Sequence, residues 1–160
     1  MAEGRPIYFL DTSALAKLYH QELGSEIVEA WAADDTTLLW ISDLARTELH
    51  SALIRKVREG EVTEEVLHEI LKCFRVDLLH RFHIVPLTAR IVEGAIDLLI
   101  EHGKRYPLRT LDALQLASAR AVEGEGVIFV TADSKLTTVA SVVFSQVLNP
   151  EVGEGGNGMR

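Results

Sequence analysis

Two aspartates follow apolar runs, at points where buried strands would end. Asp11 comes directly after the run at residues 6–10, PIYFL, and Asp133 lies two residues beyond the run at residues 126–131, GVIFVT. Aspartate is a favoured N-cap, so each residue could simply begin the helix that follows it. In open α/β sheets, however, ligands gather beyond the carboxyl ends of the strands. Either aspartate alone is therefore explained as well by capping as by ligand binding.

A third acid, Glu48, lies on the apolar face of a predicted helix. Leu44, Ala45 and Ala52 stand one turn away from it and define the face that turns toward the core. An ionised carboxylate at such a position costs several kcal/mol unless a partner compensates it. Because Glu48 is in the middle of its helix, neither capping nor the helix dipole explains it.

A fourth acid, Asp112, has similar surroundings. Gln115 and Leu116 lie one turn further along its helix, and Ala119 continues the same face. Asp112 is also close to the start of the helix, where a carboxylate interacts favourably with the helix dipole. The spacing of Asp112 alone therefore leaves open whether it binds a ligand or only interacts with the helix dipole.

One divalent cation would reconcile all four acids. Mg²⁺ and Mn²⁺ prefer carboxylate oxygens and water, and a cation offsets the repulsion among the acids. Cys73 is the single cysteine, and the histidines show no metal-ligand spacing, so no cluster of softer ligands competes. The sequence thus predicts a Mg²⁺ or Mn²⁺ site formed by Asp11, Glu48, Asp112 and Asp133.

Neighbouring side chains could support this site or compete with it. Three hydroxyl groups lie beside the strand-end acids and could add contacts, those of Thr12, Ser13 and Thr131. Arg46 or Arg109 could pair with one of the acids in place of the metal. The sequence leaves this choice open.

The elements that must position these residues alternate along the chain. Strand-like apolar runs lie at residues 6–10, 37–41, 83–87, 126–131 and 142–148. Helical spacing and caps predict helices at 13–20, 25–33, 43–58, from 63 onward, at 88–102, at 110–122 and after Asp133. Strands this apolar, separated by helices, indicate a parallel sheet covered on both faces. We expect an α/β fold, a three-layer α/β/α domain with a mainly parallel central sheet.

Length and composition fit one globular domain. The chain has 160 residues, 48% of them hydrophobic and 25% charged. The glycine-rich stretch at 151–160 has no apolar periodicity, so we expect one domain over residues 1–150 and a disordered tail. No apolar run is long enough to span a bilayer, and the first residues lack the pattern of a signal peptide. A cytoplasmic location with no membrane contact is expected.

The net charge opposes simple binding to nucleic acid. The formal charge is −8, whereas proteins that bind phosphate backbones usually carry a basic excess. A role on nucleic acid would depend on bound cations and on local basic side chains. The candidates are Lys17, Arg46, Arg55, Lys56, Arg58, Lys104, Arg105 and Arg109.

Four segments together resemble the signature blocks of PIN-domain ribonucleases, most closely VapC toxins of toxin–antitoxin pairs. They are YFLDTSALAKLY, ISDLARTELHSAL, RTLDALQLASA and IFVTADSKL, and they run in order across most of the chain. The resemblance implies a PIN-like domain whose acidic quartet is Asp11, Glu48, Asp112 and Asp133. It also implies that Ser13 and Thr131 are flanking polar residues. Where some relatives carry a further acid or Asn, this chain has Lys135 and Thr137, so one-metal and two-metal sites both stay open.

The same resemblance implies an activity and partners. It implies Mg²⁺- or Mn²⁺-dependent endonucleolytic cleavage of RNA, often tRNA or rRNA. It further implies a homodimer and a cognate VapB-like antitoxin. We expect Asp11 and Asp112 to bind the metal directly, with Glu48 and Asp133 completing the shell.

Three other interpretations were compared with this one. A haloacid-dehalogenase-like phosphatase needs a second acid where Ser13 stands, and a receiver domain needs paired early acids that are absent. A catalytically inactive PIN-like binding or scaffold module remains the alternative, since metal ligands alone do not prove turnover.

One apolar row at helical spacing fits either the core or an interface, and it consists of Val66, Leu67, Ile70, Leu71 and Phe74.

Overall fold

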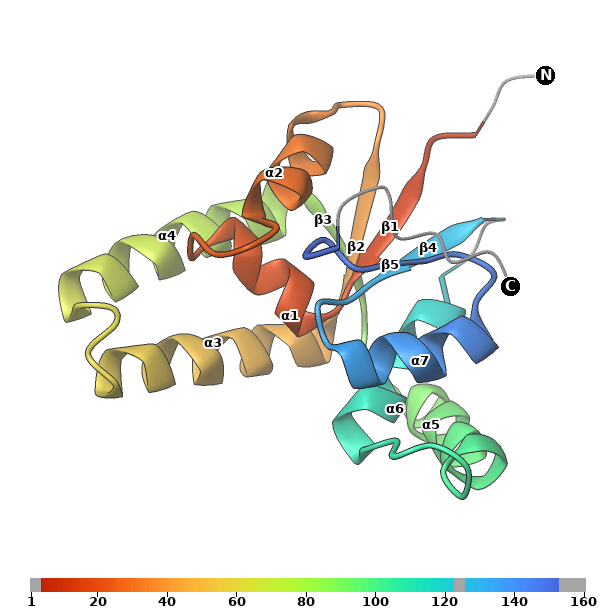
Figure 1. Ribbon diagram of the computed structural model, residues 1–160. Coiled ribbons are helices and arrows are strands. Elements are labelled where there is room, and N and C mark those ends of the chain that lie inside the picture. Colours follow the sequence, from red (N-terminus) through yellow and green to blue (C-terminus); the bar gives the residue numbers. More distant parts are fainter. Residues whose placement is uncertain (1–3, 123–125, 153–160) are drawn as a thin grey trace.

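Five strands form one parallel sheet at the centre of the computed structural model, which describes residues 4–122 and 126–152 (Figure 1). The strands are β1 (Ile7–Leu10), β2 (Leu38–Ser42), β3 (Phe82–Val85), β4 (Val127–Val130) and β5 (Val147–Leu148). Their order across the sheet is β3-β2-β1-β4-β5, and each of these pairings is parallel. The predicted α/β fold with a parallel central sheet is confirmed.

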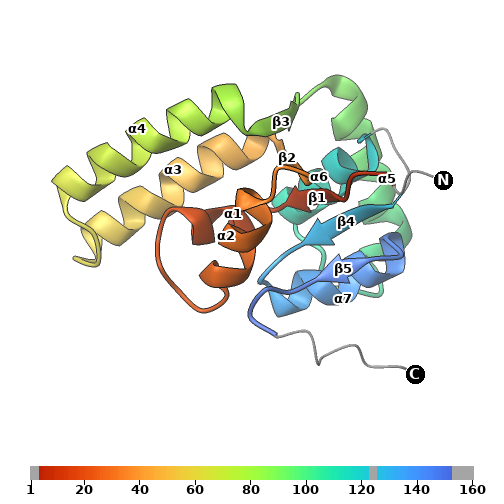
Figure 2. The same cartoon turned by 90° about the horizontal axis from the view of Figure 1, so that it is seen from above.

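Helices cover both faces of this sheet, which gives the three predicted layers. Their bounds are α1 (Thr12–Leu15), the 3₁₀ helix η1 (Ala16–Leu18), α2 (Ser25–Ala33), α3 (Asp43–Arg58), α4 (Glu64–His80), α5 (Ala89–His102), α6 (Thr110–Arg120) and α7 (Ser134–Val143). Helices α1 to α4 lie on one side and α5 to α7 on the other (Figure 1). Helices α3 and α4 extend side by side away from the sheet (Figures 1 and 2).

The apolar runs are continuous because both faces of the sheet are buried. In β1, Phe9 packs with residues of α5 to α7, whereas the next residue, Leu10, packs with residues of α1 to α4. Both side chains are fully buried. Successive strand residues point to opposite faces, so a strand between two helical layers needs apolar side chains at every position.

The last strand is much shorter than predicted. The prediction placed a strand at residues 142–148, but α7 continues to Val143 and β5 contains only Val147 and Leu148. Leu136, Val139 and Ala140 are buried at helical spacing, and this packing outweighs the strand preference of the valines that follow. Val142 consequently lies on the outer side of α7, where it is exposed.

The end of the described chain packs against the loop before α2. The ammonium group of Lys17 donates to the carbonyl of Leu23 and to Glu151 Oε1, at 2.7 Å each. Gly24 has a φ of 84°, and a Cβ there would lie 2.5 Å from the carbonyl oxygen of Pro150. Lys17 is 1% exposed, so it is not among the basic side chains that are available to bind RNA.

The predicted tail begins at Glu151, and its residues 153–160 lie outside the described residues. None of the helices within the described ranges is long and apolar enough to cross a membrane.

Candidate functional site

The four predicted acids lie around the carboxyl edge of the sheet. Asp11 directly follows β1, and Asp133 follows β4, which is the neighbour of β1. Glu48 is on α3, the helix that begins at the end of β2 on the other side of β1. Asp112 is in the first turn of α6. Because all strands are parallel, their carboxyl ends meet at this one edge.

Asp11 is a buried carboxylate held by neutral donors. Oδ1 accepts hydrogen bonds from Ser13 Oγ at 2.6 Å and from the backbone N–H of Ala14 at 2.9 Å, and Oδ2 accepts one from Thr131 Oγ1 at 2.5 Å. Its exposed fraction is 4%. Burial is the chief reason that the pKa of Asp11 is raised from 3.8 to about 6. The three hydrogen bonds lower this pKa, and the charge of Glu48 has a smaller upward effect that the value of about 6 includes. Asp11 does cap α1, and the cap fixes the orientation of its carboxylate.

The predicted hydroxyl groups join Asp11 to the loop that carries Asp133. Ser13 Oγ accepts a hydrogen bond from the N–H of Ala132 at 2.9 Å. Thr131 Oγ1 accepts one from the N–H of Asp133 at 3.1 Å, while it donates to Asp11. The carboxyl ends of β1 and β4 are therefore held in fixed register.

Glu48 is oriented by Thr12 and Gln115. Thr12 Oγ1 donates to Glu48 Oε1 at 3.0 Å, and Gln115 Nε2 donates to the same oxygen at 2.7 Å. Gln115 is itself fixed, since its Oε1 accepts a hydrogen bond from Ser42 Oγ at 3.1 Å. These donors supply the compensation that a carboxylate on an apolar face requires.

Gln115 is a site residue that sequence reasoning missed. It is 3% exposed, on the inward face of α6 one turn after Asp112. A polar amide on an otherwise apolar helix face is the signal that could have identified it, because a buried amide needs partners. Its partner Glu48 is on another helix, so spacing along the chain could not reveal the pair.

Asp112 and Asp133 share one arginine. Arg109 Nε donates to Asp112 Oδ2 at 2.8 Å, and its Nη2 donates to Asp112 Oδ1 at 3.4 Å and to Asp133 Oδ2 at 3.2 Å. The other oxygen of Asp133 caps α7 by accepting from the N–H groups of Lys135 and Leu136. The sequence named two arginines that could pair with one of the four site acids. Arg109 does so, whereas Arg46 pairs with Asp43, which is outside the site.

The acids are gathered but do not form a complete metal shell. Within residues 4–122 and 126–152, no group of three or more Asp, Glu, His or Cys side chains is arranged so that it could hold a metal ion. The donor chemistry nevertheless fits Mg²⁺ or Mn²⁺, since the four side chains offer only carboxylate oxygens. Asp11 supports this fit, because a buried carboxylate with neutral donors alone still benefits from a cation.

Most of the predicted basic candidates are exposed. Arg55, Arg58, Lys104 and Arg105 are exposed, and Lys56 is half-buried and paired with Glu61.

The row of apolar residues on α4 divides between core and surface. Phe74 is in the core, whereas Val66 is 49% exposed.

Known proteins resemble this chain in sequence and in fold. The PIN domain family model matches residues 8–142. Ribonuclease VapC45 of Mycobacterium tuberculosis is 34% identical over 136 residues, which cover 84% of this chain and 90% of the relative. Two solved structures share the fold, VapBC2 from Rickettsia felis bound to a promoter DNA fragment (TM-score 0.62, 20% identity) and FitAcB from Neisseria gonorrhoeae (TM-score 0.63, 18% identity). Each covers 89% of this chain, and the matches cover 98% and 97% of those chains, respectively.

These matches confirm the resemblance read from the four sequence segments. The family model spans the sheet from β1 to β4 together with the four acids and nearly all of α7. The protein therefore belongs to the PIN-domain family.

Proposed function

We propose that this protein is a divalent-metal-dependent endoribonuclease of the VapC type, which hydrolyses phosphodiester bonds of tRNA or rRNA in the cytoplasm. A curated relative at 34% identity carries the name ribonuclease VapC, which supports the ribonuclease assignment. The single observation that carries the metal requirement is Asp11, a buried carboxylate whose described partners are all neutral donors.

The four acids take different roles in this proposal. Asp11 and Asp112 would hold Mg²⁺ or Mn²⁺ directly, and Glu48 and Asp133 would complete the shell. A bound divalent cation lowers the pKa of a coordinated water and neutralises charge that builds on the phosphate. Ser13 and Thr131 orient Asp11, while Thr12 and Gln115 orient Glu48.

Net charge is compatible with RNA as the substrate under this proposal. The carboxylates at the sheet edge repel phosphate until a cation lies between them. The exposed basic side chains near the end of α3, Arg55 and Arg58, and those after α5, Lys104 and Arg105, would bind the RNA backbone.

The proposal is tested by metal addition and removal. Purified protein is titrated with Mn²⁺ in a calorimeter and then incubated with total RNA plus Mg²⁺ or Mn²⁺, or plus EDTA. We expect saturable Mn²⁺ binding and discrete RNA cuts that disappear in EDTA. Mn²⁺ binding without cleavage of any RNA would favour the inactive binding module, and cleavage that continues in EDTA would refute the metal requirement.

Replacing Gln115 with leucine should weaken Mn²⁺ binding by about tenfold. Glu48 loses its shortest hydrogen bond in this variant, while the buried volume is nearly kept. The matched control is Ser118→Ala, on the same helix, because Ser118 is also buried but its hydroxyl, among the described residues, donates just to the carbonyl of Leu114. Calorimetry on both variants is the measurement. Equal Mn²⁺ affinity in wild type and Gln115→Leu would remove Gln115 from the site.

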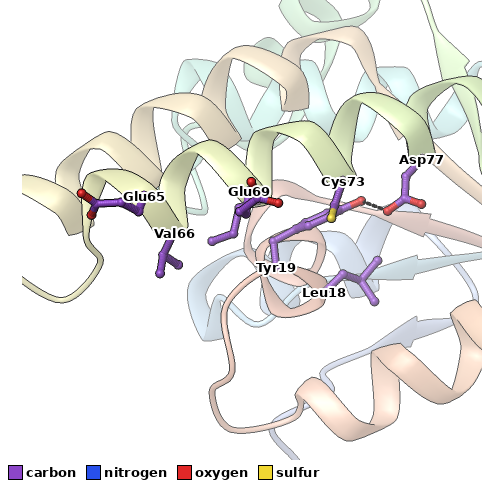
Figure 3. Close-up of a pocket in the computed structure, with 8 residues that line it drawn as sticks. Leu18, Tyr19, Glu65, Val66, Glu69, Cys73 and Asp77 are labelled. Carbon is purple, nitrogen blue, oxygen red and sulfur yellow. Dashed lines mark hydrogen bonds between the residues drawn. The ribbon is translucent and has the colours of Figure 1, made fainter.

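We also propose an antitoxin partner, and a groove beside α4 is a candidate surface for it. The groove has a volume of about 450 Å³ and lies between α4 and the η1 turn (Figure 3). Apolar Leu18, Val66 and Ile70 line it together with the acids Glu65 and Glu69. This lining suits a segment that carries apolar and basic side chains.

The far end of the groove is fixed by a hydrogen bond from the Tyr19 hydroxyl to Asp77 Oδ2 at 2.5 Å (Figure 3). Burial, together with this hydrogen bond, raises the pKa of Tyr19 well above its usual value, so the hydroxyl keeps its proton.

The homodimer that the resemblance implies stays a prediction, which light scattering on the purified protein would test.

A further inference from the structure

Arg109 occupies the oxygens that a metal ion would need. Its guanidinium contacts both oxygens of Asp112 and Oδ2 of Asp133, which is the Asp133 oxygen left over from capping α7. These contacts join α6 to the start of α7 across the site. A positive charge thus lies where two of the four carboxylates meet.

We propose that Arg109 is an internal counter-ion that competes with the divalent cation for Asp112 and Asp133, and that its displaced guanidinium then binds the RNA phosphate. The inference deepens the proposed function and rests on it. It assigns Arg109 two successive partners, first Asp112 and Asp133 and then the substrate.

The ion pairs of Arg109 lie where solvent reaches them. The arginine side chain is 72% exposed, whereas Asp112 is 16% and Asp133 32% exposed. Ion pairs exposed to water contribute little to stability because solvent screens them. A divalent cation can therefore replace the guanidinium of Arg109 on these carboxylates. The arginine side chain can turn outward without disturbing the more enclosed acids.

The side chain of Arg109 is not needed to cap α6. Its backbone forms the N-cap of α6, and its carbonyl accepts from the N–H of Ala113, but its side chain makes no capping hydrogen bond. A substitution there keeps the backbone contacts of the helix. The effects of Arg109 variants can therefore be assigned to charge and hydrogen bonding.

A displaced guanidinium at this position would lie beside bound RNA. Asp112 and Asp133 border the proposed metal site, and the phosphate must approach that same cation. Arginine binds phosphate through a planar pair of N–H donors, as it binds the carboxylate of Asp112 here. The same group thus suits both partners.

Two effects of opposite sign follow for Arg109→Gln. Removing the competing charge should tighten Mn²⁺ binding by about three- to tenfold. Removing the phosphate ligand should slow cleavage of total RNA at saturating Mn²⁺ by about tenfold or more. Arg109→Lys, which keeps the charge but loses the planar pair of donors, should lie between wild type and Arg109→Gln in both measurements.

The experiment is Mn²⁺ calorimetry and RNA cleavage on wild type, both Arg109 variants and Arg81→Gln. Arg81 is a matched control, because it also pairs with an aspartate on its own helix, Asp77, and its loss changes the net charge equally. We expect Arg81→Gln to behave as wild type in both assays. Unchanged or weaker Mn²⁺ binding by Arg109→Gln overturns the inference, as does an unchanged cleavage rate. A wild type that binds no Mn²⁺ would instead refute the proposed function.

Discussion

Replacing Asp11 with asparagine is expected to reduce Mn²⁺-dependent RNA cleavage by at least about a hundredfold, because changes even in groups that support a metal ligand cost about ten- to a hundredfold. Asp11 is the most enclosed of the four acids, and three hydrogen bonds fix its orientation. Asparagine keeps the size of the side chain but removes the negative charge that a cation requires. RNA cleavage should therefore be lost while the protein stays folded.

The measurement is the rate of RNA cleavage at saturating Mn²⁺, with circular dichroism to verify folding. Asp97→Asn is the matched control, since Asp97 is exposed on α5 and has no place in the proposed site. Cleavage by folded Asp11→Asn at the rate of the control would mean that the metal is held elsewhere or that cleavage needs none.

The same substitution should stabilise the metal-free protein at neutral pH by up to about 3 kcal/mol, since a rise of the pKa from 3.8 to about 6 corresponds to roughly that free energy. The pKa of Asp11 is raised from 3.8 to about 6, chiefly by burial. The folded protein therefore holds a proton on Asp11 more tightly than the unfolded chain does. The stability that comes from this proton is complete below pH 3.8 and is lost as the pH rises through about 6.

Urea unfolding in EDTA between pH 4 and pH 8 would measure this effect. The difference in unfolding free energy between Asp11→Asn and wild type should be small near pH 4 and should grow toward pH 7. Saturating Mn²⁺ should reverse the order by stabilising only the wild type. A difference that is constant with pH would show that burial does not raise the pKa of Asp11.

Local sequence patterns predicted the framework of this site well. Apolar runs located β1 and β4, and the rule for strand ends then placed Asp11 and Asp133 at the carboxyl edge of the sheet. Glu48 was recognised because a carboxylate on an apolar helix face requires a partner. The structure identifies that partner as a set of hydrogen-bond donors, while the metal stays a prediction.

Partners that are distant in the chain were beyond these patterns. Gln115 lies 67 residues from Glu48, and Lys17 lies 134 residues from Glu151. Lys17 lies in the short helix η1, and because lysine side chains are almost always exposed, its burial could not be foreseen. The end of α7 was missed for another reason, since the two valines at 142 and 143 favour a strand until tertiary packing is considered.

The ion pair of Lys17 bears on where the folded unit stops. The glycine-rich composition suggests a boundary before Glu151, yet Glu151 neutralises an ammonium group that is 1% exposed. Trimming the chain at residue 150 would remove the nearest carboxylate and leave that buried ammonium with the more distant Glu22, at 4.0 Å. A buried charge that loses its close partner is destabilising. A shortened protein intended for crystallisation should accordingly retain Glu151, although composition alone would discard it.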